Sequence, residues 1–457
     1  MEYDLIIIGA GPGGYNAAEK AAKAGLKVLV AEKNKVGGVC LNEGCVPTKT
    51  LLYSAKVFDN ASNGKKYGVI AKDISIDHNA VVKRKDKVVK TLTSGIASSL
   101  KAAGVTVVNG EAKILKRENN LYQVSINDEA YSAKKLLIVT GSSPALPPIN
   151  GLKEALESGF AVTNKEILDL KEVPEKLIVV GGGVIGLEMA SYFSSVGSKV
   201  TVIEALDHIA GQTDSDLVDI LQKTLEKKGV KFYLSSMVTE IKKSSVMFKA
   251  GDNEQEEDAS VVLMSIGRRA NTQNLGLENI GVETERGAIK TDEKMKTNAP
   301  EVYAAGDVNG KSMLAHTAYR EGEVAINNIL GKKDTMLYNA IPSVIYTNPE
   351  IAGVGETEQT AKEKNIDIDV VSVSMRFSGR YLAENDGGNG IFKLIVEKKN
   401  KTIIGAHAIA NYASEFIIAA GIMVQMKLNI EDVKTFVFPH PTVGEIIREA
   451  VFHYNMG

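Results

Sequence analysis

Cys40 and Cys45 are the only two cysteines of the 457-residue chain, and they lie five positions apart. This separation is slightly more than one helical turn, so a small distortion of a helix would bring the two sulfurs to bonding distance. Gly44 beside Cys45 would allow that distortion at little steric cost. Two thiols kept this close together are typical of a catalytic pair rather than a structural one. The alternative is two buried, unreactive cysteines, which are common core residues.

A histidine near the C-terminus could supply the proton transfer that thiol chemistry needs. Thiol–disulfide exchange requires a thiolate attacker and a proton carrier that works near neutral pH, for which histidine is the natural choice. Pro439 and Pro441 restrict the backbone at His440. Glu445 follows closely enough to orient the imidazole of His440 and raise its basicity. Structural roles are the better explanation for the other histidines, which are His78, His208, His316, His407 and His453.

Two copies of a nucleotide-binding fingerprint would position this chemistry. In each copy an apolar strand, at residues 3–8 and 176–180, runs into a Gly-x-Gly-x-x-Gly turn, a helix and a second strand that ends in glutamate. The glycines allow a tight turn, close approach of a pyrophosphate and close helix–strand packing, and the acid can bind ribose hydroxyls. The acid follows the first glycine by 23 positions in both copies. The residues are Gly9, Gly11, Gly14 and Glu32 in the first copy, and Gly181, Gly183, Gly186 and Glu204 in the second.

The order of these copies predicts which cofactor each one binds. The first copy leads directly into the cysteine stretch, so its ligand should exchange electrons with the thiols, and a flavin such as FAD suits this role. The second copy would then bind a nicotinamide cofactor. Residues 205–208 after Glu204 contain no arginine, and a 2′-phosphate would meet a carboxylate there. NAD is therefore favoured over NADP.

The composition of the chain excludes several other classes of protein. The apolar fraction of 44% is ordinary for a globular protein, and a formal net charge of −2 gives no indication of a nucleic-acid partner. Two cysteines cannot form the disulfide framework of a small secreted protein. No apolar run reaches membrane-spanning length, and the N-terminus enters a strand without a basic leader. We therefore predict a soluble cytoplasmic protein that does not contact a membrane.

The cysteine stretch also carries a family resemblance. The pattern Gly-Gly-x-Cys-x-Asn-x-Gly-Cys-x-Pro-x-Lys at residues 37–49 resembles the redox-disulfide signature of the flavoprotein disulfide reductases, and the resemblance extends over essentially the whole chain. In that family the first cysteine forms a mixed disulfide with the substrate and the second faces the flavin, which implies these roles for Cys40 and Cys45. Residues 438–445 resemble the family's His-x-His-Pro-Thr-x-x-Glu motif, but Phe438 replaces the first histidine. By resemblance, His440 is the base that serves the disulfide of the other subunit.

Further residues acquire expected roles from the same resemblance. Asp307, at the end of a strand, matches the aspartate that holds the ribityl chain of FAD. Lys49 and Glu188 match a pair that lies near the flavin and the nicotinamide. Two strands with glycine ends, at 136–141 and 261–267, complete the predicted cofactor-binding set. The residues at these strand ends are Thr140, Gly141 and Gly267.

Within the family, the residues at 13–15, 46–49 and 183–188 resemble those of the dihydrolipoyl dehydrogenases more than those of the other members. The second cysteine pair of mercuric reductases and high-molecular-weight thioredoxin reductases is absent. The resemblance implies oxidation of protein-bound dihydrolipoamide with reduction of NAD⁺. It also implies a homodimer and a lipoyl-bearing partner in a 2-oxo acid dehydrogenase, an acetoin dehydrogenase or a glycine cleavage system. The alternatives are a nicotinamide-dependent reductase of another small disulfide, and a non-catalytic subunit that binds a multienzyme core.

The predicted organisation is α/β, with two Rossmann-like dinucleotide-binding domains for FAD and NAD and a C-terminal α+β dimerisation domain. Residues 55–105 read as mostly helical, and the basic run 83–87 is most simply a solvated helix face. The predicted limits are 1–146 for the first part of the FAD domain, 147–265 for the NAD domain, 266–334 for the second part of the FAD domain and 335–457 for the interface domain.

Overall fold

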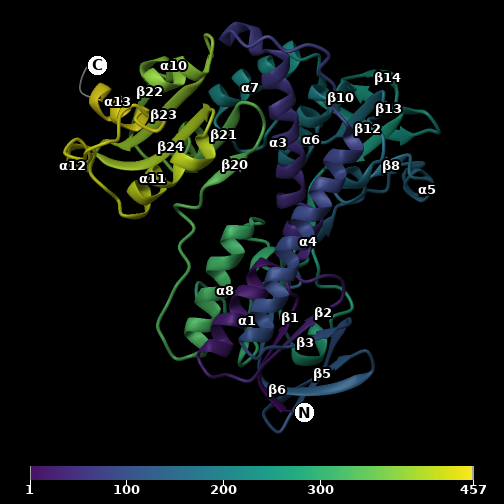
Figure 1. Ribbon diagram of the computed structural model, residues 1–457. Helices are drawn as coiled ribbons and strands as arrows, with labels where there is room; N and C mark the ends of the chain where they lie inside the picture. The colour runs from purple at the N-terminus through teal and green to yellow at the C-terminus, as the bar shows by residue number, and fades with distance from the viewer. Residues whose placement is uncertain (1, 455–457) are drawn as a thin grey trace.

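A computed structural model describes residues 2–454 and contains three main sheets (Figure 1). The first sheet lies at the bottom of Figure 1 and has the order β3-β2-β1-β6-β5-β4, with β19 paired to β6. The strand β1 is parallel to both β2 and β6, as a nucleotide-binding βαβ unit requires. Its strands are β1 (Glu2–Ile8), β2 (Val28–Glu32), β3 (Thr106–Asn109), β4 (Ala112–Glu118), β5 (Leu121–Ile126), β6 (Glu129–Ile138) and β19 (Val302–Ala304).

Both faces of β1 are buried, which explains its continuous apolar run. Leu5 and Ile7 face one core, which α1 (Pro12–Lys23) and α8 (Ala315–Ile329) cover. Ile6 and Ile8 face a second core on the opposite side of the sheet. The strand β19 follows the second sheet in the sequence but joins the first sheet, so the chain returns to where it began.

The second sheet is parallel and contains the second glycine fingerprint. Its order is β11-β10-β9-β15-β8. The strands are β8 (Ala161–Val162), β9 (Lys176–Val180), β10 (Lys199–Ile203), β11 (Lys231–Tyr233) and β15 (Val261–Met264), and its helices are α5 (Leu152–Ser158), α6 (Val184–Ser195) and α7 (Ser215–Lys227). The strands outside the three main sheets are β7 (Ser142–Pro144), β12 (Ser236–Ile241), β13 (Ser245–Ala250), β14 (Asn253–Asp258), β16 (Arg268–Ala270), β17 (Thr284–Glu285) and β18 (Ala288–Ile289).

The third sheet is antiparallel and lies at the upper left of Figure 1, in the order β20-β21-β24-β23-β22. The helix α11 packs against β21 and β24 through its apolar face. The strands are β20 (Ser343–Ile345), β21 (Glu350–Gly355), β22 (Ile368–Ser374), β23 (Ile391–Glu397) and β24 (Thr402–Ala410). The helices are α9 (Glu358–Glu363), α10 (Gly379–Glu384), α11 (Ala413–Gln425), α12 (Ile430–Val433) and α13 (Ile446–His453).

The cysteine stretch links the first sheet to a pair of long helices. The short helix α2 (Gly38–Asn42) is followed by α3 (Cys45–Ser62), which packs along α4 (His78–Ala102). In the described part of the chain no helix is long and apolar enough to cross a membrane.

One sequence prediction about α4 is wrong. The basic run 83–87 is not entirely a solvated face, because Lys85 is 3% exposed and forms ion pairs with Asp86 and Asp169. Lys83 and Lys87 are exposed, as predicted. A sequence window cannot show that Asp169, in a short 3-10 helix (Glu166–Asp169) far along the chain, pairs with this turn of α4.

A buried ion cluster joins the second and third sheets. Lys393 on β23 is 1% exposed, and its Nζ donates to Asp214 (3.0 Å) and Asp216 (2.9 Å) at the start of α7. It also donates to Glu358 of α9. Asp214 is buried as well, whereas the side chains of Asp216 and Glu358 are about half exposed. The Lys393–Asp214 pair is therefore the buried centre of the cluster.

Replacement of Lys393 by methionine should lower the thermal unfolding midpoint clearly. The change leaves the Asp214 carboxylate buried without its cation, and removal of one partner of a buried pair typically costs about 3–5 kcal/mol. Differential scanning calorimetry measures the shift. The double variant Lys393→Met with Asp214→Asn should lose less, because neither charge remains buried. An unchanged midpoint for Lys393→Met would contradict this account of the cluster.

Candidate active site

The glycine turns have backbone geometry that other residues could not adopt. Gly9 and Gly181 have φ angles of +111° and +103°, and a Cβ on them would overlap the carbonyl oxygens of Val139 and Ser265, respectively. A Cβ on Gly14 would overlap the Gly9 carbonyl, and one on Gly186 would overlap the Gly181 carbonyl. These third glycines let the helices α1 and α6 pack against their own turns.

The middle glycines instead face open space. A Cβ on Gly183 would meet nothing within 4 Å, and one on Gly11 would meet only the Gly38 Cα, at 3.9 Å. The turns thus leave an open cradle at the N-termini of α1 and α6, where a pyrophosphate can approach the backbone. Both cradles fit a bound dinucleotide.

The two fingerprint acids hold their turns in the same way. Glu32 accepts hydrogen bonds from the Ala10 and Asn34 amides, both at 2.7 Å. Glu204 accepts them from the Gly182 amide at 2.6 Å and the Leu206 amide at 2.8 Å. A carboxylate has about four acceptor sites, so each acid keeps capacity for ribose hydroxyls. Sequence reasoning anticipated only this second role.

One cavity of about 2040 Å³ joins both cradles to the cysteines. Its volume is roughly twice the upper end of ordinary small-molecule pockets, about 1,000 Å³, as two dinucleotides would require. Among the predicted site residues, those that line it are Gly9, Gly11, Glu32, Cys40, Cys45, Lys49, Thr140, Gly141, Gly181, Gly183, Glu188, Glu204, Gly267 and Asp307. Gly14 and Gly186 lie behind the wall as packing residues, and His440 and Glu445 are outside the cavity.

The two thiols differ in acidity. The hydrogen bond from the Cys40 thiol and, to a smaller extent, the Lys49 charge lower the pKa of Cys45 to about 7, against the effect of burial. The pKa of Cys40 is raised, chiefly by its hydrogen bond with Cys45 and by its burial. When the pair is reduced, Cys45 is therefore the thiolate near neutral pH, and it is the side chain more open to the cavity.

Lys49 and Glu188 form an ion pair from α3 to α6. The Lys49 Nζ lies 2.9 Å from both carboxylate oxygens of Glu188. The Tyr346 amide donates to the same carboxylate at 3.0 Å, and the Lys49 Nζ lies 4.3 Å from the centre of the Tyr346 ring. Three segments distant in the sequence thus fix this pair beside the thiols.

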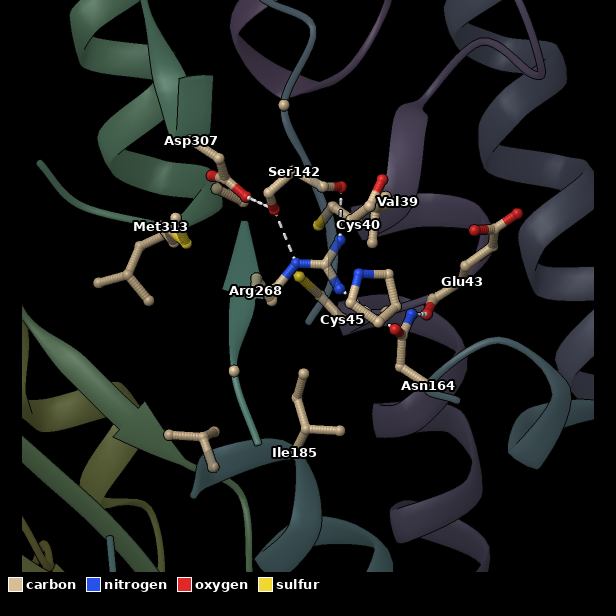
Figure 2. Close-up of a pocket in the computed structure, with 18 of the residues that line it drawn as sticks. Val39, Cys40, Glu43, Cys45, Ser142, Asn164, Ile185, Arg268, Asp307 and Met313 are labelled. Carbon is tan, nitrogen blue, oxygen red and sulfur yellow. Dashed lines mark hydrogen bonds between the residues drawn. The ribbon is translucent and has the colours of Figure 1, made fainter. Parts of the chain in front are cut away.

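A hydrogen-bonded chain that sequence reasoning missed crosses the cavity (Figure 2). Asp307 accepts a 2.5 Å hydrogen bond from the Ser142 hydroxyl, which in turn accepts one from the Arg268 Nε at 2.7 Å. Arg268 also donates to Asn164 at 3.1 Å, and Asn164 donates to the Glu43 carbonyl at 2.7 Å. Arg268 follows the predicted Gly267, so a cation at the carboxyl end of a parallel strand was the available signal.

The proposed acid–base pair forms in the C-terminal part of the chain, which contains the third sheet. The His440 Nδ1 lies 2.7 Å from the Glu445 Oε2, with the His440 side chain 76% exposed and that of Glu445 9% exposed. The Thr442 hydroxyl donates to the Pro439 carbonyl at 3.0 Å and accepts from the Glu445 amide at 3.1 Å, which shapes the turn. A single chain does not bring His440 into the cavity that holds the cysteines.

Comparisons with known proteins agree with this geometry. The pattern of the family described as pyridine nucleotide-disulphide oxidoreductase matches residues 3–322, and that of its dimerisation domain matches residues 341–451. The chain belongs to this family. Its membership confirms the predicted α/β fold with a C-terminal dimerisation domain, and FAD and NAD as cofactors.

Curated relatives match along almost their whole length. A dihydrolipoyl dehydrogenase of Mycoplasma genitalium is 37% identical over 99% of this chain and 100% of its own. A dihydrolipoyl dehydrogenase of Geobacillus stearothermophilus is 38% identical over 98% of this chain and 96% of its own.

Solved structures are similar as well. The HOCl-induced flavoprotein disulfide reductase RclA of Escherichia coli, as a Cu(II) complex, has a TM-score of 0.88 at 28% identity and covers 100% of both chains. LpdA of Mycobacterium tuberculosis has a TM-score of 0.89 at 25% identity, over 98% of this chain and 99% of its own.

The surroundings of Glu204 predict the choice of nicotinamide cofactor. Between positions 203 and 213, the described residues that line the cavity include neither lysine nor arginine, and Glu204 itself is an anion. A 2′-phosphate would therefore lack a strong cationic partner, and we expect NAD⁺ to be preferred by at least about tenfold. The ratio of kcat/KM for NAD⁺ to that for NADP⁺ measures this preference. Equal values would contradict the role of Glu204.

Proposed function

We propose that this protein oxidises protein-bound dihydrolipoamide to lipoamide and reduces NAD⁺ to NADH, with Cys40 and Cys45 as its redox pair. The observation that carries the proposal is the single cavity in which both thiols lie between two dinucleotide cradles. Relatives named dihydrolipoyl dehydrogenase, which align over nearly the full chain, support this choice of substrate. Bound FAD would take an electron pair from the reduced cysteines, and NAD⁺ would carry it away as hydride.

The residues of the chain carry out the thiol exchange in two balanced steps. His440 removes a proton from one substrate thiol, and the resulting thiolate attacks the Cys40 sulfur. The Cys40–Cys45 bond breaks, a mixed disulfide forms on Cys40, and Cys45 leaves as a thiolate. The second substrate thiol then attacks the substrate sulfur of the mixed disulfide and its proton passes to the Cys40 sulfur, so that the cyclic disulfide closes and Cys40 is released as a thiol. The substrate is oxidised by two electrons and the cysteine pair is reduced by two.

The distinct acidities of the thiols suit these roles. A leaving thiol of low pKa departs faster, and Cys45 has a pKa lowered to about 7. Lys49 lies near it and is held in place by Glu188. Glu445 orients the imidazole of His440, since its carboxylate lies 2.7 Å from the Nδ1.

The active site is completed by a second copy of the chain. The dimerisation domain supports a homodimer, and we propose that His440 of one chain serves the cysteines of the other, since it is exposed and outside its own cavity. We likewise propose the FAD domain as 1–146 with 266–334, the NAD domain as 147–265 and the interface domain as 335–457. The physiological substrate would be the lipoyl-bearing protein of a 2-oxo acid dehydrogenase, an acetoin dehydrogenase or a glycine cleavage system, in the cytoplasm.

A turnover assay of the purified FAD-bound protein tests the proposal. Dihydrolipoamide with NAD⁺ should be turned over, with glutathione disulfide plus NADH or NADPH as the control reaction. Faster reduction of glutathione disulfide than oxidation of dihydrolipoamide would overturn the choice of substrate and leave the class of enzyme intact.

A further inference from the structure

Arg268 is a partly buried cation without a carboxylate in direct contact. Its three hydrogen-bond acceptors are the Ser142 hydroxyl and carbonyl, each at 2.7 Å, and the Asn164 side-chain oxygen at 3.1 Å. All three acceptors are neutral, and among the described residues no carboxylate lies within ion-pair distance of the guanidinium. Burial of a charge is costly unless an opposite charge lies nearby. The position of Arg268 therefore calls for an anion.

The cavity near Arg268 contains a candidate for that anion. In the view of Figure 2 the guanidinium lies next to the Cys45 side chain, and the charges of these two groups interact. Burial lowers the pKa of Arg268, whereas the charges of Asp307, Glu43 and a Cys45 thiolate raise it, in that order. Electrostatic stabilisation is reciprocal, so a guanidinium that a thiolate stabilises must stabilise the thiolate by the same free energy.

The other cation near the thiols is already paired. Lys49 lies 2.9 Å from the Glu188 carboxylate, which partly offsets the effect of the Lys49 charge on Cys45. Arg268 keeps its full charge, because an arginine side chain stays protonated in proteins. The titratable groups that act most on Cys45 are Cys40, Lys49 and Glu188, and the charge of Cys45 in turn acts on Arg268, Tyr15, Tyr319 and Tyr346. Among them Arg268 is the cation without an anionic partner in contact.

Arg268 also fixes the loop between the cysteines. Asn164 accepts from Arg268 through its oxygen and donates through its nitrogen to the carbonyl of Glu43, two residues before Cys45. Asn164 follows β8 of the second sheet and is 7% exposed, and Arg268 belongs to β16, which pairs with β7. The bridge thus ties the redox loop to both nucleotide-binding parts of the chain.

We propose that Arg268 is a positioning residue for the redox pair. Its guanidinium holds the Glu43–Cys45 loop through Asn164 and provides the unpaired positive charge that favours the Cys45 thiolate. This inference rests on the proposed redox role of the cysteines but not on the identity of the substrate. In the two-electron-reduced protein, bound FAD would give a long-wavelength absorption band with a Cys45 thiolate, and this band serves as the probe. The band is lost as the pH falls through the pKa of Cys45.

The decisive variant is Arg268→Gln. We expect the pH midpoint of the band to rise by roughly half a unit to one unit, which is about a three- to tenfold change in the ionisation constant. Arg269→Gln is the matched control, because Arg269 is the adjacent residue of the same strand but is exposed, and its midpoint should not move. Arg268→Lys restores the charge without the planar fork, so its midpoint should return most of the way to the wild-type value.

A second variant keeps the test valid if Arg268→Gln does not fold. Asn164→Asp places a carboxylate against the guanidinium and removes the donor to Glu43, so its midpoint should also rise. If Arg268→Gln or Asn164→Asp binds FAD fully and keeps the wild-type midpoint, the proposal is wrong. Weaker FAD binding by Arg268→Gln with an unchanged midpoint would likewise overturn the proposal. It would indicate that the guanidinium binds the cofactor instead. Turnover of dihydrolipoamide by the wild type, measured separately, shows whether the proposed function itself fails.

Discussion

Replacement of Cys45 by serine should abolish dihydrolipoamide turnover, with a loss of about a thousandfold or more, while FAD stays bound. The serine hydroxyl cannot form the disulfide that accepts the electron pair, so no part of the thiol exchange remains. The cavity and both glycine turns are untouched, which is why the cofactor should be retained. The measurement is steady-state turnover together with the FAD-to-protein ratio of the purified variant.

The FAD ratio separates a chemical loss from a failure to fold. A variant that holds one FAD per chain but is inactive supports the assignment of the pair. Substantial turnover by Cys45→Ser would remove Cys45 from the mechanism and would leave Cys40 without its partner.

Two inactive variants should restore activity when they are combined in one dimer. We expect Cys45→Ser and His440→Ala, unfolded and refolded together, to recover roughly a quarter of wild-type turnover. Random pairing makes half of the dimers mixed, and each mixed dimer has one intact site, if the two sites act independently. The physical reason is that His440 is exposed and lies outside the cavity of its own chain.

Each variant refolded alone is the control and should stay inactive. Mass spectrometry or differential tagging establishes that mixed dimers have formed. If confirmed mixed dimers show no activity, the histidine acts within its own chain and the proposed shared site is incorrect.

The parts of the site that depend on local sequence were the predictable ones. A turn that needs a glycine at positive φ, such as Gly9 or Gly181, can be recognised from the sequence because no other residue fits there. The strand β9 was predicted with its observed limits, since continuous apolar runs in a parallel sheet are distinctive. The helix α1 begins at Pro12, because proline is well accommodated in a first helical turn.

Tertiary neighbours account for what the sequence did not reveal. Arg268 and Asn164 are separated by more than a hundred positions, and neither belongs to a spacing pattern that indicates a hydrogen bond. The same is true of Lys393 and Asp214, whose pairing depends on how the second and third sheets pack. The strand β24 was also missed, although its apolar residues form much of the core of the third sheet's body.

The central claim is that dihydrolipoamide passes its electrons to the Cys40–Cys45 disulfide. The most direct test adds one equivalent of dihydrolipoamide to the oxidised, FAD-bound protein without NAD⁺ and without oxygen, and then alkylates the free thiols for mass spectrometry. The account predicts that neither cysteine is alkylated before the addition and that both become available after it. Cysteines that stay bridged after the addition, or that are already free in the oxidised protein, would contradict the account.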